Sequence, residues 1–114
     1  MWGPASGLDP AAARLVRQGF LEHRPAGLAH TLRGVIAAGA DVARLAPRLA
    51  GVEVPALVIV GAADRGSRAP SDALAAALPR AELVVVPDAG HVVNLQQPVA
   101  FNAALTAFLE RLDA

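Results

Sequence analysis

The sequence has 114 residues, a formal net charge of zero and no cysteine. This length suits a single domain and leaves no room for two independent hydrophobic cores. Hydrophobic residues make up 54% of the chain and charged residues 18%, a balance that excludes a disordered polypeptide. Because cysteine is absent, disulfides, thiolate metal sites and a cysteine nucleophile are excluded as well.

The charge and hydropathy patterns exclude two further classes of partner. All ten basic residues are arginines, and they are spread along the chain, so no basic patch for nucleic acid is predicted. The longest apolar run, near residues 54–63, is interrupted by Pro55 and Gly61 and is too short to span a membrane. Residues 1–7 contain no basic stretch and no apolar run, so no signal peptide is predicted. We therefore expect a cytoplasmic protein without nucleic-acid or membrane partners.

The first half of the sequence predicts helices and no strand. Asp9 and Pro10 form a typical helix start, an N-cap acceptor followed by proline at the first helical position. Arg24 and Pro25 should end that helix, because proline disfavours helical backbone in the residue before it. Apolar residues at helical spacing continue after this break. The expected helices span residues 11–23, 26–40 and 41–49, the last one bent or broken at Pro47.

The pattern changes near Gly51. Residues 56–60, Ala-Leu-Val-Ile-Val, form an aliphatic run that is typical of a strand buried on both faces of a parallel sheet. A second run of this kind follows later, and the segment between the two runs is predicted to be helical, which favours a right-handed parallel crossover. We thus predict an α/β unit with the order β-α-β-α. Its elements are a strand over 56–60, a loop over 61–68, a helix over 70–78, a strand over 83–86 and a helix starting near Pro98.

Asp64 and His91 follow the two predicted strands at similar offsets. Catalytic groups of an open parallel sheet lie at the carboxyl ends of its strands, so the two side chains are expected at the same rim. A carboxylate that accepts a hydrogen bond from one imidazole nitrogen leaves the other nitrogen available as a base. Gly61 and Gly90 are expected to let the backbone turn sharply at this rim. Taken singly, each residue has an ordinary explanation, Asp64 as a helix cap or turn residue and His91 as a solvated loop histidine.

Other polar residues indicate no cofactor or metal site. His23 and His30 lie on predicted helices without a carboxylate or thiol at ligand spacing, so no metal site is predicted. Arg65 and Arg68 lie near the acid and are expected to be solvated, although this position would suit an anionic substrate. The loop after the first strand lacks the glycine patterns that bind phosphate, so a nucleotide-binding domain and a bound cofactor are not supported.

Two segments resemble the α/β-hydrolase family. Residues 54–64, Val-Pro-Ala-Leu-Val-Ile-Val-Gly-Ala-Ala-Asp, are similar to the family's stretch from the penultimate strand to the acid of the catalytic triad. Residues 81–91, Ala-Glu-Leu-Val-Val-Val-Pro-Asp-Ala-Gly-His, are similar to its last strand and triad histidine. Residues 98–102 and 108–109 match its final helix. The resemblance implies that Asp64 is the orienting acid and that His91 is the general base and later the general acid.

The resemblance also implies a division of the chain. Residues 51–114 look like the C-terminal part of an α/β-hydrolase core, and residues 1–50 look like the end of the helical cap that often precedes it. The alternative for residues 1–50 is an ordinary helical layer. The fold class expected is therefore α/β, the C-terminal part of an α/β-hydrolase fold preceded by cap-like helices.

The family's nucleophile has no counterpart in the sequence. The family order is nucleophile, acid, histidine, with the nucleophile in a Gly-x-Ser-x-Gly turn. The segment from Gly3 to Gly7 has its serine in the wrong place, and Ser67 and Ser71 follow the acid. No oxyanion-hole segment is visible either. Gln96 stands where the family often has glutamate, and we expect it to serve the same helix-start role.

The favoured interpretation is therefore an esterase-like or lactonase-like hydrolase for ester-like or other activated carbonyl substrates. Under this interpretation we expect a truncated or split form that lacks its nucleophile and is inactive alone. The segments Leu32-Arg33-Gly34 and 93–98 resemble those of enol-lactone hydrolases and of the succinyl-hydroxycyclohexadiene carboxylate synthases of the menaquinone pathway, a similarity that indicates no particular substrate.

The alternative is a non-catalytic interaction module. Two parallel strands are too few for a self-sufficient sheet, so the chain would need a missing N-terminal half or a homodimer partner.

Overall fold

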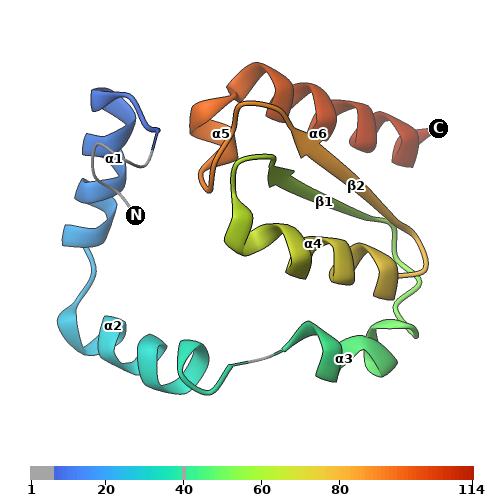
Figure 1. Cartoon of the computed structure of the whole chain (residues 1–114), viewed down its shortest axis with the longest axis horizontal. Coiled ribbons are helices and arrows are strands. Elements are labelled where there is room, and N and C mark those ends of the chain that lie inside the picture. Colours follow the sequence, from blue (N-terminus) through green and yellow to red (C-terminus); the bar gives the residue numbers. More distant parts are fainter. Residues whose placement is uncertain (1–6, 40) are drawn as a thin grey trace.

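The computed structural model describes residues 7–39 and 41–114. The helices before residue 51 form an arc, and this arc leads into an α/β unit formed by the rest of the chain (Figure 1). The expectations for residues 3–6 and for Ala40 lie outside the described residues. In chain order, the elements are α1 (Pro10–Leu21), α2 (Pro25–Thr31), η2 (Leu32–Ile36), α3 (Val42–Leu49), β1 (Ala56–Gly61), α4 (Arg65–Ala77), β2 (Ala81–Val86), α5 (Val93–Gln96) and α6 (Pro98–Asp113).

The two strands pair in parallel, as predicted. Their register runs from Ala56 opposite Ala81 to Gly61 opposite Val86, so both strands end at the same rim. Helix α4 connects them and covers one face of the pair, and α6 covers the other face (Figure 1). The order β-α-β-α is therefore confirmed, with the short helix α5 as an unpredicted addition before α6.

The hydrophobic core lies at the carboxyl ends of the strands. Val86, Ala89 and Val93 are buried there, and Ile59, Val84 and Phe101 pack against them. The expectation of strands buried on both faces holds only at their carboxyl ends. Only their last residues are buried, and the others are half-buried or, at Glu82, exposed. The best-packed part of the molecule is thus the part beneath the loop that carries His91.

Helix α4 begins earlier than the sequence suggested. A loop was expected over 61–68 with a helix from Pro70, but the helix starts at Arg65 and contains Pro70 in its interior. The cause is Asp64, whose side chain caps the helix by accepting a hydrogen bond from the Ser67 N–H at 3.2 Å. This cap fixes the first turn before the proline is reached, and the helix tolerates the single backbone hydrogen bond that proline removes.

The helices before residue 51 follow the predicted order with different ends. Helix α1 starts as expected, with Asp9 Oδ1 accepting from the Ala12 N–H at 2.8 Å. The second predicted helix is shorter, because α2 passes into the π-helical turn η2 and ends at Ile36. Helix α3 runs through Pro47 to Leu49 and packs against α4. None of the described helices has the length and apolar character that a membrane crossing requires.

Candidate active site

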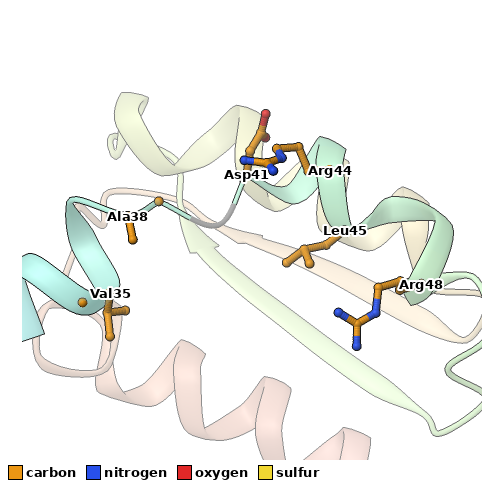
Figure 2. A pocket seen from close by; sticks show the side chains of 8 residues that line it. Val35, Ala38, Asp41, Arg44, Leu45 and Arg48 are labelled. Carbon is orange, nitrogen blue, oxygen red and sulfur yellow. The ribbon is translucent and has the colours of Figure 1, made fainter.

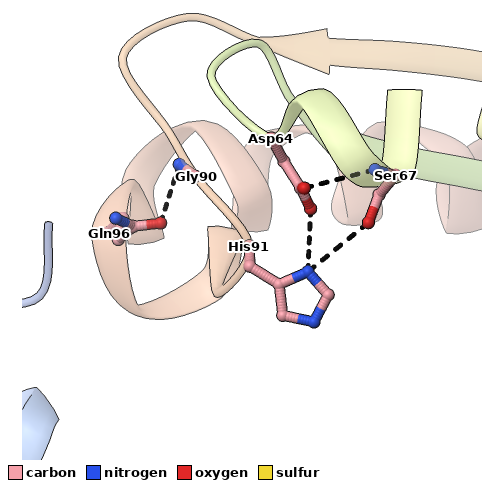
Figure 3. A network of polar contacts seen from close by, with 5 residues as sticks. All are labelled: Asp64, Ser67, Gly90, His91 and Gln96. Carbon is pink, nitrogen blue, oxygen red and sulfur yellow. Dashed lines mark hydrogen bonds and ion pairs between the residues drawn. The ribbon is translucent and has the colours of Figure 1, made fainter. Parts of the chain in front are cut away.

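Asp64 and His91 meet at the carboxyl-end rim of the strand pair. Asp64 lies between β1 and α4, and His91 lies in the loop between β2 and α5. The distance between His91 Nδ1 and Asp64 Oδ2 is 2.8 Å, a hydrogen bond of ordinary length (Figure 3). The contact that the strand order predicted is therefore present in the structure.

The two loops are held together backbone to backbone. The Ala62 N–H donates to Val86 O and the Ala63 N–H donates to Ala89 O, both at 2.9 Å. At Gly61 the loops approach so closely that a Cβ atom would lie 2.2 Å from Gly90 O. Neither Gly61 nor Gly90 has a positive φ, so the backbone gives no support to their expected role as the residues that permit sharp turns. Gly61 is required for this close approach, and the left-handed residue of the second loop is Asp88, with a φ of 54°.

Two glutamines hold the histidine loop from the α5–α6 side. Gln96 Oε1 accepts a hydrogen bond from the Gly90 N–H at 2.7 Å, next to His91 in the chain. Gln97 Nε2 donates to Asp88 O at 3.3 Å. The expected helix-start role of Gln96 was wrong, because its side chain fixes the loop before His91 and α6 starts without a side-chain cap.

Ser67, which the sequence brought up only as a serine misplaced for a nucleophile, is a polar neighbour of the pair. Its N–H donates to the capping oxygen Asp64 Oδ1, and its Oγ lies 3.4 Å from His91 Nδ1 (Figure 3). Three side chains therefore meet at one point, two of them from the start of α4. The signal that would have revealed Ser67 is its position three residues after a capping aspartate, which the predicted late helix start concealed.

The electrostatics of the site favour an ionised Asp64. Its side chain is 13% exposed, whereas that of His91 is 52% exposed. The hydrogen bond from His91 lowers the pKa of Asp64, and hydrogen bonds from the Ser67 side chain and backbone lower it further, against a smaller opposing effect of burial. A carboxylate that stays ionised near neutral pH is able to orient an imidazole and stabilise its protonated form.

The remaining candidates from the sequence lie apart from this pair. His23, just after the end of α1, has its Nδ1 2.6 Å from Gly19 O of that helix, and His30 is exposed. Arg68 forms an exposed ion pair with Asp72, and Arg65 is exposed beside the acid loop. Within residues 7–39 and 41–114, no three histidine, aspartate or glutamate side chains are grouped so as to hold a metal ion.

A pocket of about 460 Å³ lies between η2 and α3, away from the pair (Figure 2). Arginines of α3 face apolar side chains across it, and none of its residues belongs to the loops that carry Asp64 and His91. It is lined by Gly34, Val35, Ala38, Gly39, Asp41, Arg44, Leu45 and Arg48.

Comparison with known proteins identifies the family. Residues 2–104 match the profile described as the alpha/beta hydrolase family. The chain belongs to this family. The family resemblance of residues 54–64 and 81–91 and the α/β fold class are thereby confirmed. The cap-like role of residues 1–50 and the catalytic roles of Asp64 and His91 stay predictions.

Among similar proteins, a putative 2-succinyl-6-hydroxy-2,4-cyclohexadiene-1-carboxylate synthase of Bacillus subtilis (strain 168) is 33% identical to the chain over 94 residues. This match covers 82% of the chain and 34% of the relative, so the chain spans about a third of that protein's length. The structure of MenH from S. aureus matches with a TM-score of 0.59 at 23% identity, over 61% of this chain and 26% of that one. This similarity shows a shared fold.

Proposed function

We propose that Asp64 and His91 are the orienting acid and the general base of a hydrolase-type triad that acts on ester-like or other activated carbonyl substrates. One observation carries the proposal: the 2.8 Å hydrogen bond between His91 Nδ1 and Asp64 Oδ2, at the carboxyl ends of adjacent parallel strands. In the α/β-hydrolase order of nucleophile, acid and histidine, these are the positions of the last two members.

The mechanism follows from which imidazole nitrogen Asp64 engages. With the Nδ1 proton held by Asp64, His91 Nε2 accepts a proton from a nucleophile hydroxyl as that oxygen attacks the substrate carbonyl. The imidazolium then gives the proton to the leaving group, and an acyl intermediate remains on the nucleophile. Water attacks this intermediate with the same proton transfers, which releases the acid product and regenerates the nucleophile.

We propose that the nucleophile and the oxyanion donors come from protein segments that this sequence does not contain, as in a truncated or split hydrolase. The sequence has no Gly-x-Ser-x-Gly segment, and the chain matches about a third of its Bacillus subtilis relative. We also propose that the helices before residue 51 form the end of a cap over the site. The order of helices before β1 supports this assignment.

The test is a chimaera in which this chain replaces the matching third of the Bacillus subtilis relative. We expect turnover of that relative's substrate or of a small nitrophenyl ester. Asp64→Asn and His91→Ala should each lower kcat/KM by about 10³-fold or more, as loss of a triad member generally does. Asp72→Asn and His30→Ala are matched controls, because both residues are exposed and lie outside the Asp64–Ser67–His91 contacts. A folded, active chimaera that keeps its rate in His91→Ala would refute the proposal.

The isolated chain provides a second measurement. Without a nucleophile and oxyanion donors, it should not hydrolyse the nitrophenyl ester above the buffer rate. Turnover that disappears in His91→Ala would show that the chain supplies its own nucleophile, and the part of the proposal that places it elsewhere would be abandoned.

A further inference from the structure

We propose that Ser67 is a positioning residue whose hydroxyl restrains the imidazole of His91 beside Asp64. The inference rests on the proposed function, because it concerns how the same pair is prepared for catalysis. It assigns to the first turn of α4 a role beyond forming a helix.

The Ser67 hydroxyl lies beside the hydrogen bond that joins the two partners. His91 Nδ1 lies 2.8 Å from Asp64 Oδ2 and 3.4 Å from Ser67 Oγ, so one ring nitrogen faces two oxygen atoms (Figure 3). The shorter contact is the main hydrogen bond, and the longer one is weak. A ring restrained by two acceptors has less freedom to rotate away from Asp64 than a ring held by one.

The same hydroxyl also acts on the carboxylate. A hydrogen bond from the Ser67 side chain contributes to the lowered pKa of Asp64, second to the hydrogen bond from His91. A hydroxyl at this position can donate its proton to the carboxylate and accept the Nδ1–H of His91. In this arrangement Nδ1 must carry the proton, which leaves Nε2 as the basic nitrogen.

The role of the hydroxyl is separable from that of the backbone. The Ser67 N–H donates to the capping oxygen Asp64 Oδ1 at 3.2 Å, and any residue other than proline at this position keeps that N–H. Ser67→Ala therefore removes the hydroxyl alone and leaves the cap of α4 in place. Ser67→Thr and Ser67→Val form a second pair of variants. Their side chains are similar in shape to each other, but only the threonine carries a hydroxyl.

The experiment measures the imidazole tautomer of His91 by ¹⁵N NMR and the pKa of Asp64 by its carboxyl ¹³C shift, in the intact chain. Ser67→Ala and Ser67→Val should lower the fraction of the Nδ1–H tautomer and raise the pKa of Asp64 towards its ordinary value. Ser67→Thr should restore both. Ser71→Ala is the matched control, because Ser71 lies on the same helix and has a similar degree of burial. Unchanged tautomer and pKa in both hydroxyl-free variants would overturn the proposal.

The chimaera separates this inference from the proposed function. There, Ser67→Ala should lower kcat by about two- to tenfold, the range that one ordinary hydrogen bond supports, with KM unchanged. If His91→Ala leaves the chimaera active, the proposed function fails even though the tautomer result stands. If His91→Ala abolishes activity but Ser67→Ala lowers kcat without changing the tautomer, the positioning role fails and the proposed function stands.

Discussion

At the scale of single residues, Asp64 has two structural tasks at once. Its Oδ1 caps helix α4 through the Ser67 N–H, and its Oδ2 accepts the hydrogen bond from His91. The sequence presented the helix cap and the partner of His91 as competing explanations. The structure contains both, because a carboxylate has two oxygens and the helix start and the histidine loop lie on different sides of it.

This double engagement predicts a dependence of stability on pH. The pKa of Asp64 is depressed in the folded chain, so the folded state binds the proton less readily than the unfolded state does. The stabilisation is therefore fully present above the ordinary aspartate pKa of about 3.9 and is lost as pH falls through the lower folded value. Asp64→Asn should be less stable than the wild type near neutral pH, and this difference should shrink in acid.

Urea unfolding from neutral pH to about pH 3 measures this effect. Asp72→Asn is the control, because its ion pair with Arg68 is exposed at 49% and 45% and such pairs contribute little to stability. A difference between wild type and Asp64→Asn that stays constant across the whole range would contradict the prediction.

At the scale of elements, the end of β1 and the histidine loop form the tightest junction in the site. A Cβ atom at Gly61 would lie 2.2 Å from Gly90 O and 2.3 Å from Ala89 O, and these are backbone atoms that cannot rotate away. The loop after β2 would have to move outward, and His91 would move with it. The packing of this junction thus connects the strand pair to the geometry of the site.

Gly61→Ala should therefore destabilise the chain by about 1–3 kcal/mol, the usual effect of overpacking, and should weaken the contact between Asp64 and His91. Gly19→Ala in α1 is the matched control, since no heavy atom lies within 4 Å of a Cβ built there. Alanine there should stabilise by about 0.5–1 kcal/mol through helix propensity. Thermal unfolding and the His91 ¹⁵N spectrum provide the two measurements. Equal effects of both substitutions would refute the close-approach explanation.

How well the sequence predicted each element depends on the range of the interactions that form it. The start of α1 was predictable because Asp9 and Pro10 are adjacent, and the strands were predictable from continuous aliphatic runs. The start of α4 was missed because Pro70 suggested a later start than the cap at Asp64 produces. The turn η2 and the short helix α5 have no distinct hydrophobic period. The contacts of Ser67 and Gln96 were invisible because each joins a residue of a helix to the loop that carries His91, and the sequence alone does not show how these segments lie in space.

At the scale of the whole molecule, the chain is less compact than an ordinary domain. Its Cα radius of gyration is 16.0 Å, whereas a compact domain of this length has about 13 Å. Large apolar side chains are exposed on α1, η2 and α6, for example Leu21 at 72%, Val35 at 66% and Val99 at 84%. Each strand also has an outer edge that no other described strand pairs. Apolar surface and open strand edges of this kind are typical of protein interfaces.

We therefore predict that the isolated chain self-associates, and we propose that either a second copy or an N-terminal half of the fold covers these surfaces in the functional protein. With a formal net charge of zero, electrostatic repulsion does not oppose contact between copies. Sedimentation velocity should show a mass that rises with protein concentration, and added sulfate should strengthen the association because it favours apolar burial.

Substitutions distinguish the surfaces that take part in this association. Leu21→Gln on α1 and Val99→Gln on α6 each remove one exposed apolar side chain. Arg33→Gln is the control, because it changes an exposed residue but removes no large apolar side chain. If Leu21 or Val99 lies in the interface, its glutamine variant should have a lower average mass than the wild type at the same protein concentration. Arg33→Gln should not.

If the wild type sediments as a monomer at every concentration, with or without sulfate, the exposed apolar side chains do not drive association and the homodimer proposal fails. If association persists unchanged in both the leucine and the valine variant, the contact lies instead along the strand edges. There, Leu57→Pro in β1 should abolish it by removing a backbone N–H that points away from β2, because the N–H groups of Ala56 and Ala62 bond on the β2 side and successive residues of the strand alternate.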